Sequence, residues 1–140
     1  MKKVSVLIVE DDYVQADMLA SIFKRFFSRY NKTNNVLSGT TDCATKLNDC
    51  LLIDFAIDSK EARTKINEGD YLLVTLDGAL YGGDHGRNLL DSMNTQQLKK
   101  TMIVSGDTEF VIECRKKGMT CIEKPISISN FEKSLKIFLS

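Results

Sequence analysis

The stretch VSVLIVEDD, residues 4–12, is the best guide to the fold of this chain. Its first part, Val4–Val9, is an apolar run rich in β-branched residues, without the alternation of apolar and polar residues seen in half-exposed strands. Such a run predicts a strand buried on both faces, as in a parallel sheet covered by helices. Three acidic residues, Glu10, Asp11 and Asp12, end the run, so carboxylates are expected at the carboxyl end of a buried strand.

Four further apolar runs repeat this pattern along the chain: Leu51–Ile57, Tyr71–Leu76, Thr101–Ser105 and Met119–Glu123. The segments that follow the five runs carry helical apolar spacing or helix caps: Tyr13–Tyr30, Ser59–Asn67, Arg87–Lys99, Thr108–Lys117 and Ser129–Leu139. Strands that alternate with helices in this way predict an α/β fold. We expect a doubly wound, five-stranded parallel sheet with helices on both faces.

One segment, residues 31–50, interrupts the alternation. It is rich in Asn, Thr, Ser and Asp and has no clear periodicity, which predicts an insertion or extended loop between the first helix and the second strand. The chain length of 140 residues suits a single domain spanning residues 1–140. The insertion accounts for the extra length, so no separate output domain is expected.

Composition excludes several classes of function. The 19 basic and 19 acidic residues cancel, which argues against direct binding of nucleic acid. No run approaches the roughly 18 apolar residues of a membrane-spanning helix, and the N-terminus lacks a signal-peptide pattern, so a cytoplasmic location without membrane insertion is expected. The cysteines, Cys43, Cys50, Cys114 and Cys121, are expected to be ordinary thiols, because their spacing is wider than that of common zinc ligands.

Polar residues stand at the carboxyl ends of four predicted strands, where open α/β sheets bind their ligands. These residues are Glu10 and Asp11, Asp77, Ser105 and Lys124. Close carboxylates repel one another, and an oxygen-only donor set without His or Cys favours Mg²⁺ or Mn²⁺. A hydroxyl and a lysine opposite a metal suit a transferred phosphoryl group, with Asp77 as the nucleophile that becomes an aspartyl phosphate.

Four segments carry a family resemblance: VLIVEDD (6–12), LLVTLD (72–77), MIVSGD (102–107) and IEKPIS (122–127). In order, spacing and strand-end placement they resemble the signature segments of response-regulator receiver domains of two-component signalling. The resemblance covers residues 4–139 apart from 31–50. It implies a single-domain receiver with the flavodoxin-like (βα)5 fold.

The resemblance also implies a role for each residue of the site. Asp77 would be the phospho-acceptor, receiving its phosphoryl group from a histidine kinase or a phosphotransfer protein. Asp11 would bind Mg²⁺ directly and Glu10 through water, with Asp77 and the backbone carbonyl of Ala79 as the remaining protein ligands.

Two further residues would contact the phosphoryl group. Ser105 matches the hydroxyl that moves towards it, and Lys124 matches the lysine that pairs with it. The resemblance further implies a cis peptide bond between Lys124 and Pro125.

The function implied is a phosphorylation-dependent switch. Phosphorylation of Asp77 would alter a protein-binding surface formed by about residues 108–139, which a downstream protein would recognise. The chain would not be an enzyme beyond catalysing its own phosphoryl transfer and dephosphorylation.

Besides the insertion at residues 31–50, the chain departs from the family pattern at two places. Cys121 stands where the family has an aromatic switch residue, and the loop Gly78–Gly86 lacks the usual proline. These departures leave open a phosphorylation-independent interaction module on the same fold. A phosphohydrolase with an aspartyl-phosphate intermediate is disfavoured, because Ala79 occupies the position of a general acid. His85 is expected to be an incidental loop residue, and Asp12 a helix cap.

Overall fold

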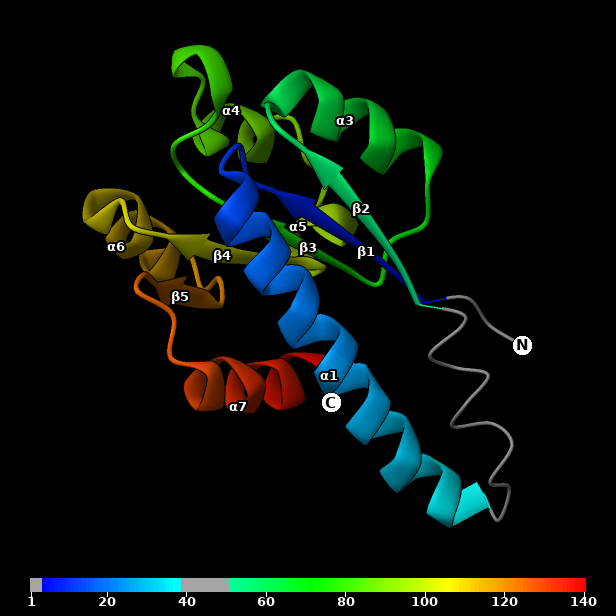
Figure 1. Cartoon of the computed structure of the whole chain (residues 1–140). Helices are drawn as coiled ribbons and strands as arrows, with labels where there is room; N and C mark the ends of the chain where they lie inside the picture. Colours follow the sequence, from blue (N-terminus) through cyan, green and yellow to red (C-terminus); the bar gives the residue numbers. More distant parts are fainter. Residues whose placement is uncertain (1–3, 39–50) are drawn as a thin grey trace.

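The computed structural model describes the backbone of residues 4–38 and 51–140, and the side chains of residues 4–29 and 51–140. A five-stranded parallel sheet runs through its centre in the order β2-β1-β3-β4-β5, with helices on both faces (Figure 1). The strands are β1 (Val4–Val9), β2 (Leu51–Ala56), β3 (Leu73–Leu76), β4 (Thr101–Ser105) and β5 (Cys121–Glu123). The predicted doubly wound, flavodoxin-like α/β architecture is confirmed.

Helices connect the strands and follow the last one. Their bounds are α1 (Tyr13–Ser38), α3 (Ser59–Glu68), α4 (Gly86–Asp91), α5 (Thr95–Lys99), α6 (Thr108–Lys116) and α7 (Ile128–Leu139), with a short 3-10 turn η1 at Tyr81–Gly83. Within the described ranges, none of these helices is long and apolar enough to cross a membrane.

The first helix is longer than the sequence pattern predicts. We expected it to break at Asn31, but α1 continues to Ser38, through the first part of the predicted insertion. The residues from Tyr13 to Ser38 include no glycine or proline, and Asn and Thr lower helix propensity by only a fraction of a kcal/mol each, roughly 0.7 at most. The rest of the predicted insertion, residues 39–50, lies outside the described residues, as do Cys43 and Cys50.

The predicted helix Arg87–Lys99 is wrong as a single element. The structure has two helices here, α4 and α5, separated by Ser92-Met93-Asn94. Asn94 begins the second one through a capping box: its side chain accepts from Gln97 N at 2.8 Å, and the Gln97 side chain accepts from Asn94 N at 3.0 Å. These reciprocal bonds satisfy backbone N–H groups that a new helix start leaves without partners.

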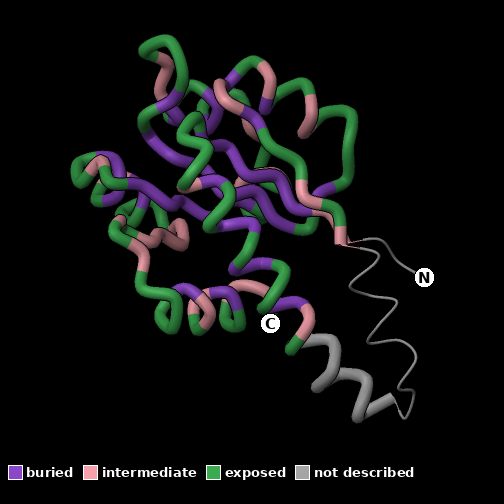
Figure 2. The backbone as a smooth tube through the Cα atoms, viewed as in Figure 1, coloured by how far each residue is buried: buried purple, intermediate pink, exposed green. Residues whose placement is uncertain are grey.

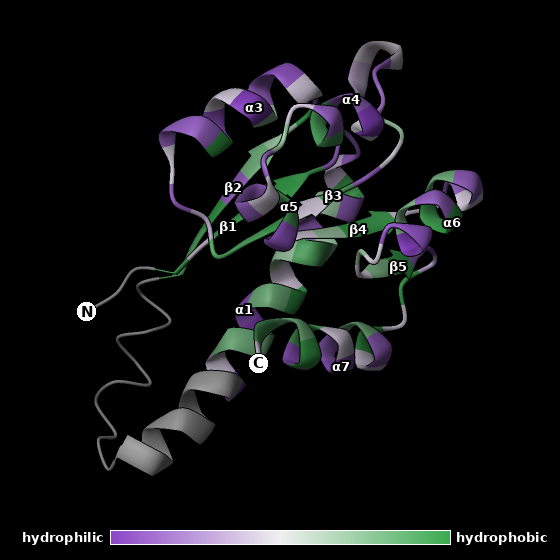
Figure 3. Cartoon of the chain, turned by 180° about the vertical axis from the view of Figure 1, so that it is seen from behind, coloured by the Kyte–Doolittle hydropathy of each residue, from purple (hydrophilic) through white to green (hydrophobic). Residues whose placement is uncertain are grey.

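Two apolar cores fill the space between the sheet and its helices. Along β1, Val6 and Ile8 belong to the core under α1 and α7, whereas Leu7 and Val9 belong to the core under α3, α4 and α6. All four side chains are at most 1% exposed, so the prediction of a strand buried on both faces is confirmed. Buried segments follow the central strands in Figure 2, and the same strands are apolar in Figure 3.

The outer strand β2 differs from that expectation. Among the strands that the structure describes it pairs only with β1 and forms one edge of the sheet, and its Leu52 and Phe55 side chains are exposed. An apolar run alone does not tell an edge strand from a central one, because that distinction depends on strand order.

The parallel register brings the carboxyl ends of the strands together. Backbone hydrogen bonds connect neighbouring strands at this end: Asp77 N donates to Val9 O at 3.1 Å, Glu10 N to Ala56 O at 2.9 Å and Lys124 N to Ser105 O at 2.9 Å. The peptide bond between Lys124 and Pro125 is cis, as the resemblance implied.

Gly86 is constrained by this edge of the sheet. A Cβ added there would overlap the backbone oxygen of Asp77 and lie 3.1 Å from Leu76 Cγ, so a side chain at position 86 must displace the strand end that carries Asp77.

We therefore expect Gly86→Ala to lower the free energy of unfolding by about 2 kcal/mol, the range found for overpacked cores. Gly106→Ala is the matched control, because its added Cβ would meet only Lys124 Cβ, at an ordinary 3.8 Å. Chemical denaturation of the two variants makes the comparison. Equal stability of both variants would contradict the close packing assigned to Gly86.

Candidate functional site

Three polar side chains are buried at the carboxyl edge of the sheet. Glu10 follows β1, Asp77 follows β3, and Ser105 is the last residue of β4; their exposed fractions are 4%, 8% and 0%. Carboxylates are seldom buried without a charged partner, because removing them from water is costly. Their burial at one edge requires a compensating cation.

Lys124, directly after β5, supplies that charge. Its ammonium donates to Glu10 Oε1 and, at 2.9 Å, to Asp77 Oδ2, while its own side chain is 14% exposed. One lysine therefore joins the ends of three strands. Of the five side chains predicted to form the site, the structure brings Glu10, Asp77 and Lys124 into direct contact.

The electrostatics of this trio follow from burial. Burial raises the pKa of Glu10 to about 7, with the Asp77 charge adding to the shift and Lys124 opposing it. Burial alone would lower the pKa of Lys124, but its hydrogen bonds to Glu10 and Asp77 hold that pKa above its ordinary value. Lys124 therefore stays charged at neutral pH, while Glu10 can exchange a proton there.

Asp11 and Asp12 lie at the rim of the site and are exposed. Asp12 begins α1, because its Oδ1 accepts from Val14 N at 2.9 Å and from Gln15 N at 3.3 Å. The prediction that Asp12 is a helix cap is thus confirmed. Asp11 is the acidic residue at this rim whose carboxylate faces solvent beside the buried trio.

A cation site is not fully assembled from side chains. Among the described residues, no group of three or more His, Cys, Asp or Glu side chains is arranged to hold a metal ion. The expected donor set contains three carboxylates, of which Glu10 and Asp77 are buried against Lys124 and Asp11 is exposed. The structure provides two buried carboxylates and an exposed one at the ends of the neighbouring strands β1 and β3, an oxygen-only donor set of the kind Mg²⁺ prefers.

The loop after Asp77 presents the backbone of Ala79. Ala79 and His85 form an isolated antiparallel bridge, flanked by bonds from Gly86 N to Gly78 O at 2.8 Å and from Leu80 N to Asp84 O at 3.0 Å. In such a pair the bridged residue directs its own N–H and C=O away from the partner segment. The Ala79 carbonyl is therefore not used by these two bonds.

Ser105 lies between two loops. Its Oγ accepts from Gly78 N at 3.2 Å and from Asp107 N at 3.0 Å. Gly78 directly follows Asp77, so the Ser105 hydroxyl is next to the peptide group of the predicted acceptor. A Cβ at position 78 would lie 2.9 Å from Phe110 Cδ2 and 3.1 Å from Ser105 Oγ, which explains why glycine follows Asp77.

Asp84 attaches the same loop to α3. Its Oδ2 accepts from Ser59 N at 2.7 Å and its Oδ1 accepts from Asn88 Nδ2 at 2.8 Å. Partial burial would raise the pKa of Asp84, but its bonds to Ser59 and Asn88 prevail and lower that pKa to about 2. Asp84 therefore remains a carboxylate that holds the loop at physiological pH.

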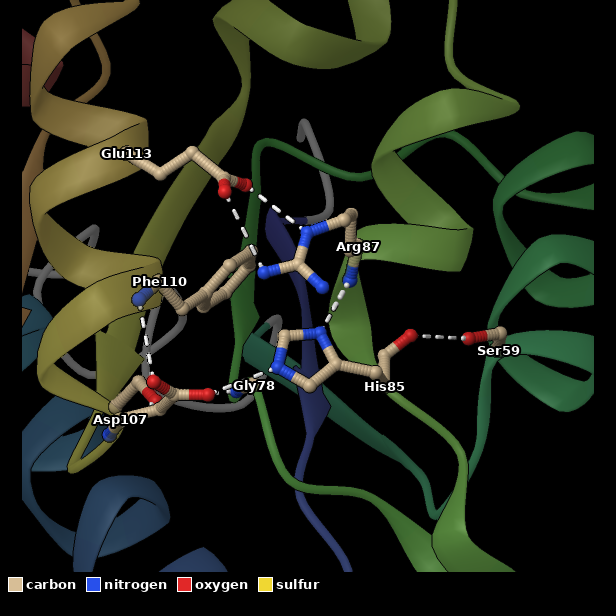
Figure 4. Close-up of polar contacts among 8 residues, drawn as sticks. Ser59, Gly78, His85, Arg87, Asp107, Phe110 and Glu113 are labelled. Carbon is tan, nitrogen blue, oxygen red and sulfur yellow. Dashed lines mark hydrogen bonds and ion pairs between the residues drawn. The ribbon is translucent and has the colours of Figure 1, made fainter.

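His85 and Asp107 form a contact that sequence reasoning missed (Figure 4). The His85 ring nitrogen Nε2 lies 2.9 Å from Asp107 Oδ2, and both side chains are partly buried. No local pattern indicates this pair, since its members belong to different loops. The two loops meet because they follow β3 and β4, which are paired in the sheet.

Several solved structures share the fold of this chain. A putative response regulator from Chloroflexus aurantiacus matches with a TM-score of 0.69 and 19% identity, covering 99% of this chain and 98% of that one. The receiver domain of the Francisella response regulator 1452 matches with a TM-score of 0.61 and 23% identity over 98% of this chain and 97% of its own.

The chain has the fold of response-regulator receiver domains.

A third structure in the group holds a ligand. The Thermotoga maritima response regulator TrrA, solved in complex with Mg²⁺ and a beryllium fluoride, matches with a TM-score of 0.69 and 16% identity, over 97% of this chain and 99% of that one. No protein-family model matches the sequence, and no curated protein sequence matches it either. The likeness to receiver domains is therefore one of fold, at identities that do not by themselves transfer individual residue roles.

Cys121 occupies β5 of this receiver fold, where the resemblance leads one to expect an aromatic ring. It is half-buried, and burial raises the pKa of its thiol. Cys114 on α6 is fully buried, and burial raises its pKa to about 11. Both thiols are free, and both are expected to be protonated and unreactive at neutral pH.

The buried ion trio leads to a stability prediction. We expect Lys124→Met to lower the free energy of unfolding by about 3 kcal/mol at pH 8, because it leaves two buried carboxylates without a cation. Glu10 has a raised folded-state pKa, so its contribution to stability is present below its ordinary value of 4.5 and is lost as the pH rises through about 7. The cost of the variant should therefore shrink at pH 5.5.

The measurement is denaturant unfolding in the presence of a metal chelator at both pH values. Lys100→Met is the matched control, because Lys100 pairs with Asp70, whose side chain is 97% exposed, and such pairs contribute under about 1 kcal/mol. If the two lysine variants cost the same and neither depends on pH, the trio does not stabilise the fold as described.

Proposed function

We propose that this chain is a phosphorylation-dependent signalling switch in which Asp77 accepts a phosphoryl group from a histidine kinase or a phosphotransfer protein. The observation that carries the proposal is the contact of Lys124 with both Glu10 and Asp77 at the carboxyl edge of the sheet. A buried carboxylate beside a fixed ammonium is suited to carry a phosphoryl group, whose oxygens the ammonium can pair with. The receiver fold of the whole described chain supports the same reading.

The proposed transfer takes place at the Asp77 carboxylate. One Asp77 carboxylate oxygen attacks the phosphorus, the oxygen–phosphorus bond forms, and the phosphorus–nitrogen bond of a phosphohistidine breaks. The electron pair of that bond goes to the histidine nitrogen, which takes up a proton from solvent, so the donor leaves with a neutral imidazole. During transfer, Lys124 pairs with the phosphoryl oxygens in place of Asp77 Oδ2, and the Ser105 hydroxyl donates to another of them.

A divalent cation fits the remaining groups. Asp11, Asp77 and the Ala79 carbonyl would hold Mg²⁺ or Mn²⁺ directly, and Glu10 would hold it through water; the exposed Asp11 and the Ala79 carbonyl are both available for this. When bound, the cation would supply positive charge that offsets the repulsion between the carboxylates and the incoming phosphoryl group. The titration of Glu10 near neutral pH means that burial, more than charge pairing, governs its state before any cation binds.

The output of the switch would be a change of surface. Phosphorylation adds charge and acceptor oxygens at the end of β3, next to Ser105 and Lys124 on β4 and β5. A downstream protein would read the change on the face of α6, β5 and α7, residues 108–139. In this proposal the chain acts in the cytoplasm and is not an enzyme beyond forming and losing its own phosphoryl group.

A phosphorylation-independent interaction module remains the second candidate, because Cys121 replaces the ring expected on β5. A small thiol there cannot report on the site by moving an aromatic side chain inwards. The two candidates differ in whether the affinity of a partner changes with Mg²⁺ and beryllofluoride.

We expect Asp77→Asn to abolish Mg²⁺-dependent labelling by acetyl phosphate, because the amide cannot act as the nucleophile. Incorporated phosphate is measured on the intact protein by mass spectrometry. Asp91→Asn on the exposed face of α4 is the control and should be labelled like the wild type. Labelling that survives Asp77→Asn would rule out Asp77 as the acceptor.

A further inference from the structure

The starting observation is that two helix caps are bonded to each other. His85 caps α4, since its Nδ1 accepts from Arg87 N at 3.0 Å, and Asp107 caps α6, since its Oδ1 accepts from Phe110 N at 3.2 Å. The other ring nitrogen of His85 and the other carboxylate oxygen of Asp107 are 2.9 Å apart (Figure 4). Because Nδ1 accepts a hydrogen bond, a neutral ring carries its proton on Nε2 and donates it to Asp107.

The His85 ring is held from several sides. It stands edge-on to the Phe110 ring, with 4.8 Å between the ring centroids and an angle of 89° between the planes. Phe110 is fully buried, so it provides a fixed surface. The backbone oxygen of His85 also accepts from Ser59 Oγ at 3.3 Å, which ties the residue to α3. The hydrogen bond from His85 holds the pKa of the Asp107 carboxyl below its ordinary value.

This pair adjoins the predicted acceptor. A Cβ built on Gly78, the residue after Asp77, would lie 3.2 Å from His85 Nε2 and 3.1 Å from Ser105 Oγ. Ser105 Oγ accepts from the backbone N–H of both Gly78 and Asp107. The bond between His85 and Asp107 therefore closes a ring of contacts that joins the loop after β3 to the loop after β4, with the Ser105 hydroxyl inside it.

We propose that His85 and Asp107 form a positioning clasp that fixes the Ser105 hydroxyl relative to Asp77 and so sets the rate at which Asp77 gains its phosphoryl group. This inference rests on the proposed function and deepens it. Neither residue touches the reacting atoms. They act indirectly, by keeping the two loops close enough for the N–H groups of Gly78 and Asp107 to donate to Ser105 Oγ.

The clasp also determines what the Ser105 hydroxyl can do. Two N–H donors occupy both lone pairs of Ser105 Oγ, so the only hydrogen bond that the hydroxyl can still make is the one that it donates. That proton is then directed to a phosphoryl oxygen on Asp77. If the two loops separate, the N–H donors no longer constrain the hydroxyl, and its alignment with the phosphoryl group is lost.

The test uses two variants that break the clasp but keep the caps. In His85→Asn, the side-chain oxygen occupies the place of Nδ1 and can still cap α4, but the side chain is too short to reach Asp107. In Asp107→Ser, the hydroxyl can still cap α6. Glu113→Gln is the matched control, because it weakens the neighbouring ion pair between α4 and α6, from Arg87 to Glu113 at 3.0 Å, which does not involve Ser105.

We expect the rate of acetyl phosphate labelling to fall roughly tenfold in each single variant, the lower end of the effect of removing an orienting partner. The double variant should be no slower than either single one, because the clasp acts as a unit. The Mg²⁺ concentration that gives half-maximal labelling should not change, and Glu113→Gln should be labelled like the wild type. Labelling at the wild-type rate in both single variants would overturn the clasp.

Because the chain has a single histidine, the NMR signals of its imidazole report on the clasp without a substitution in His85 or Asp107. In imidazole ¹⁵N spectra, all signals arise from His85, and we expect the form protonated on Nε2. Adding Mg²⁺ and beryllofluoride should shift these signals in the wild type but not in Ser105→Ala, since Ser105 connects the site to Asp107. Signals that do not respond in the wild type, although beryllofluoride binds, overturn the clasp. If the wild-type protein is not labelled and does not bind beryllofluoride, both the clasp and the proposed function are overturned.

Discussion

The Lys124 ammonium, held between the buried carboxylates of Glu10 and Asp77, is the interaction on which the site depends. It joins the ends of β1, β3 and β5, strands that are not consecutive in the chain. A parallel sheet places these ends at one edge, and the buried charges could not remain there without a cation. The same arrangement places the Asp77 carboxylate next to a fixed positive charge, and the proposed phosphoryl transfer to Asp77 depends on this pair.

Hydrogen bonds at the starts of helices, as well as apolar packing, hold the loops around this trio in place. Asp84 ties the loop after β3 to the start of α3, and His85 ties it to Asp107 at the start of α6. Ser105 lies within this network, bonded to the backbone of both loops. A change at Asp77 can therefore reach α6 through the peptide bond to Gly78 and the hydrogen bonds of Ser105 with Gly78 and Asp107. Helix α6 is part of the face proposed to bind a partner.

Much of this could be predicted from the sequence, because strand ends are marked locally. Apolar runs that stop abruptly at Glu10 or Asp77 indicate both the strand and the residue at its carboxyl end, and the parallel topology then brings these ends together. The length of α1 could not be predicted, since polar helix residues resemble loop residues in composition. The clasp could not be predicted either, because His85 and Asp107 belong to separate loops after β3 and β4, and no spacing along the chain indicates that their side chains meet.

The most direct test of the account is a heteronuclear NMR titration with Mg²⁺ and then beryllofluoride. We expect Mg²⁺ to shift the amide signals of residues 10–12 and 77–79. Beryllofluoride should then shift those of Ser105, Asp107 and Lys124, with the response continuing into α6. Unchanged signals at Asp77 and Lys124 after both additions would contradict the central claim that these buried groups form a phosphoryl-accepting site.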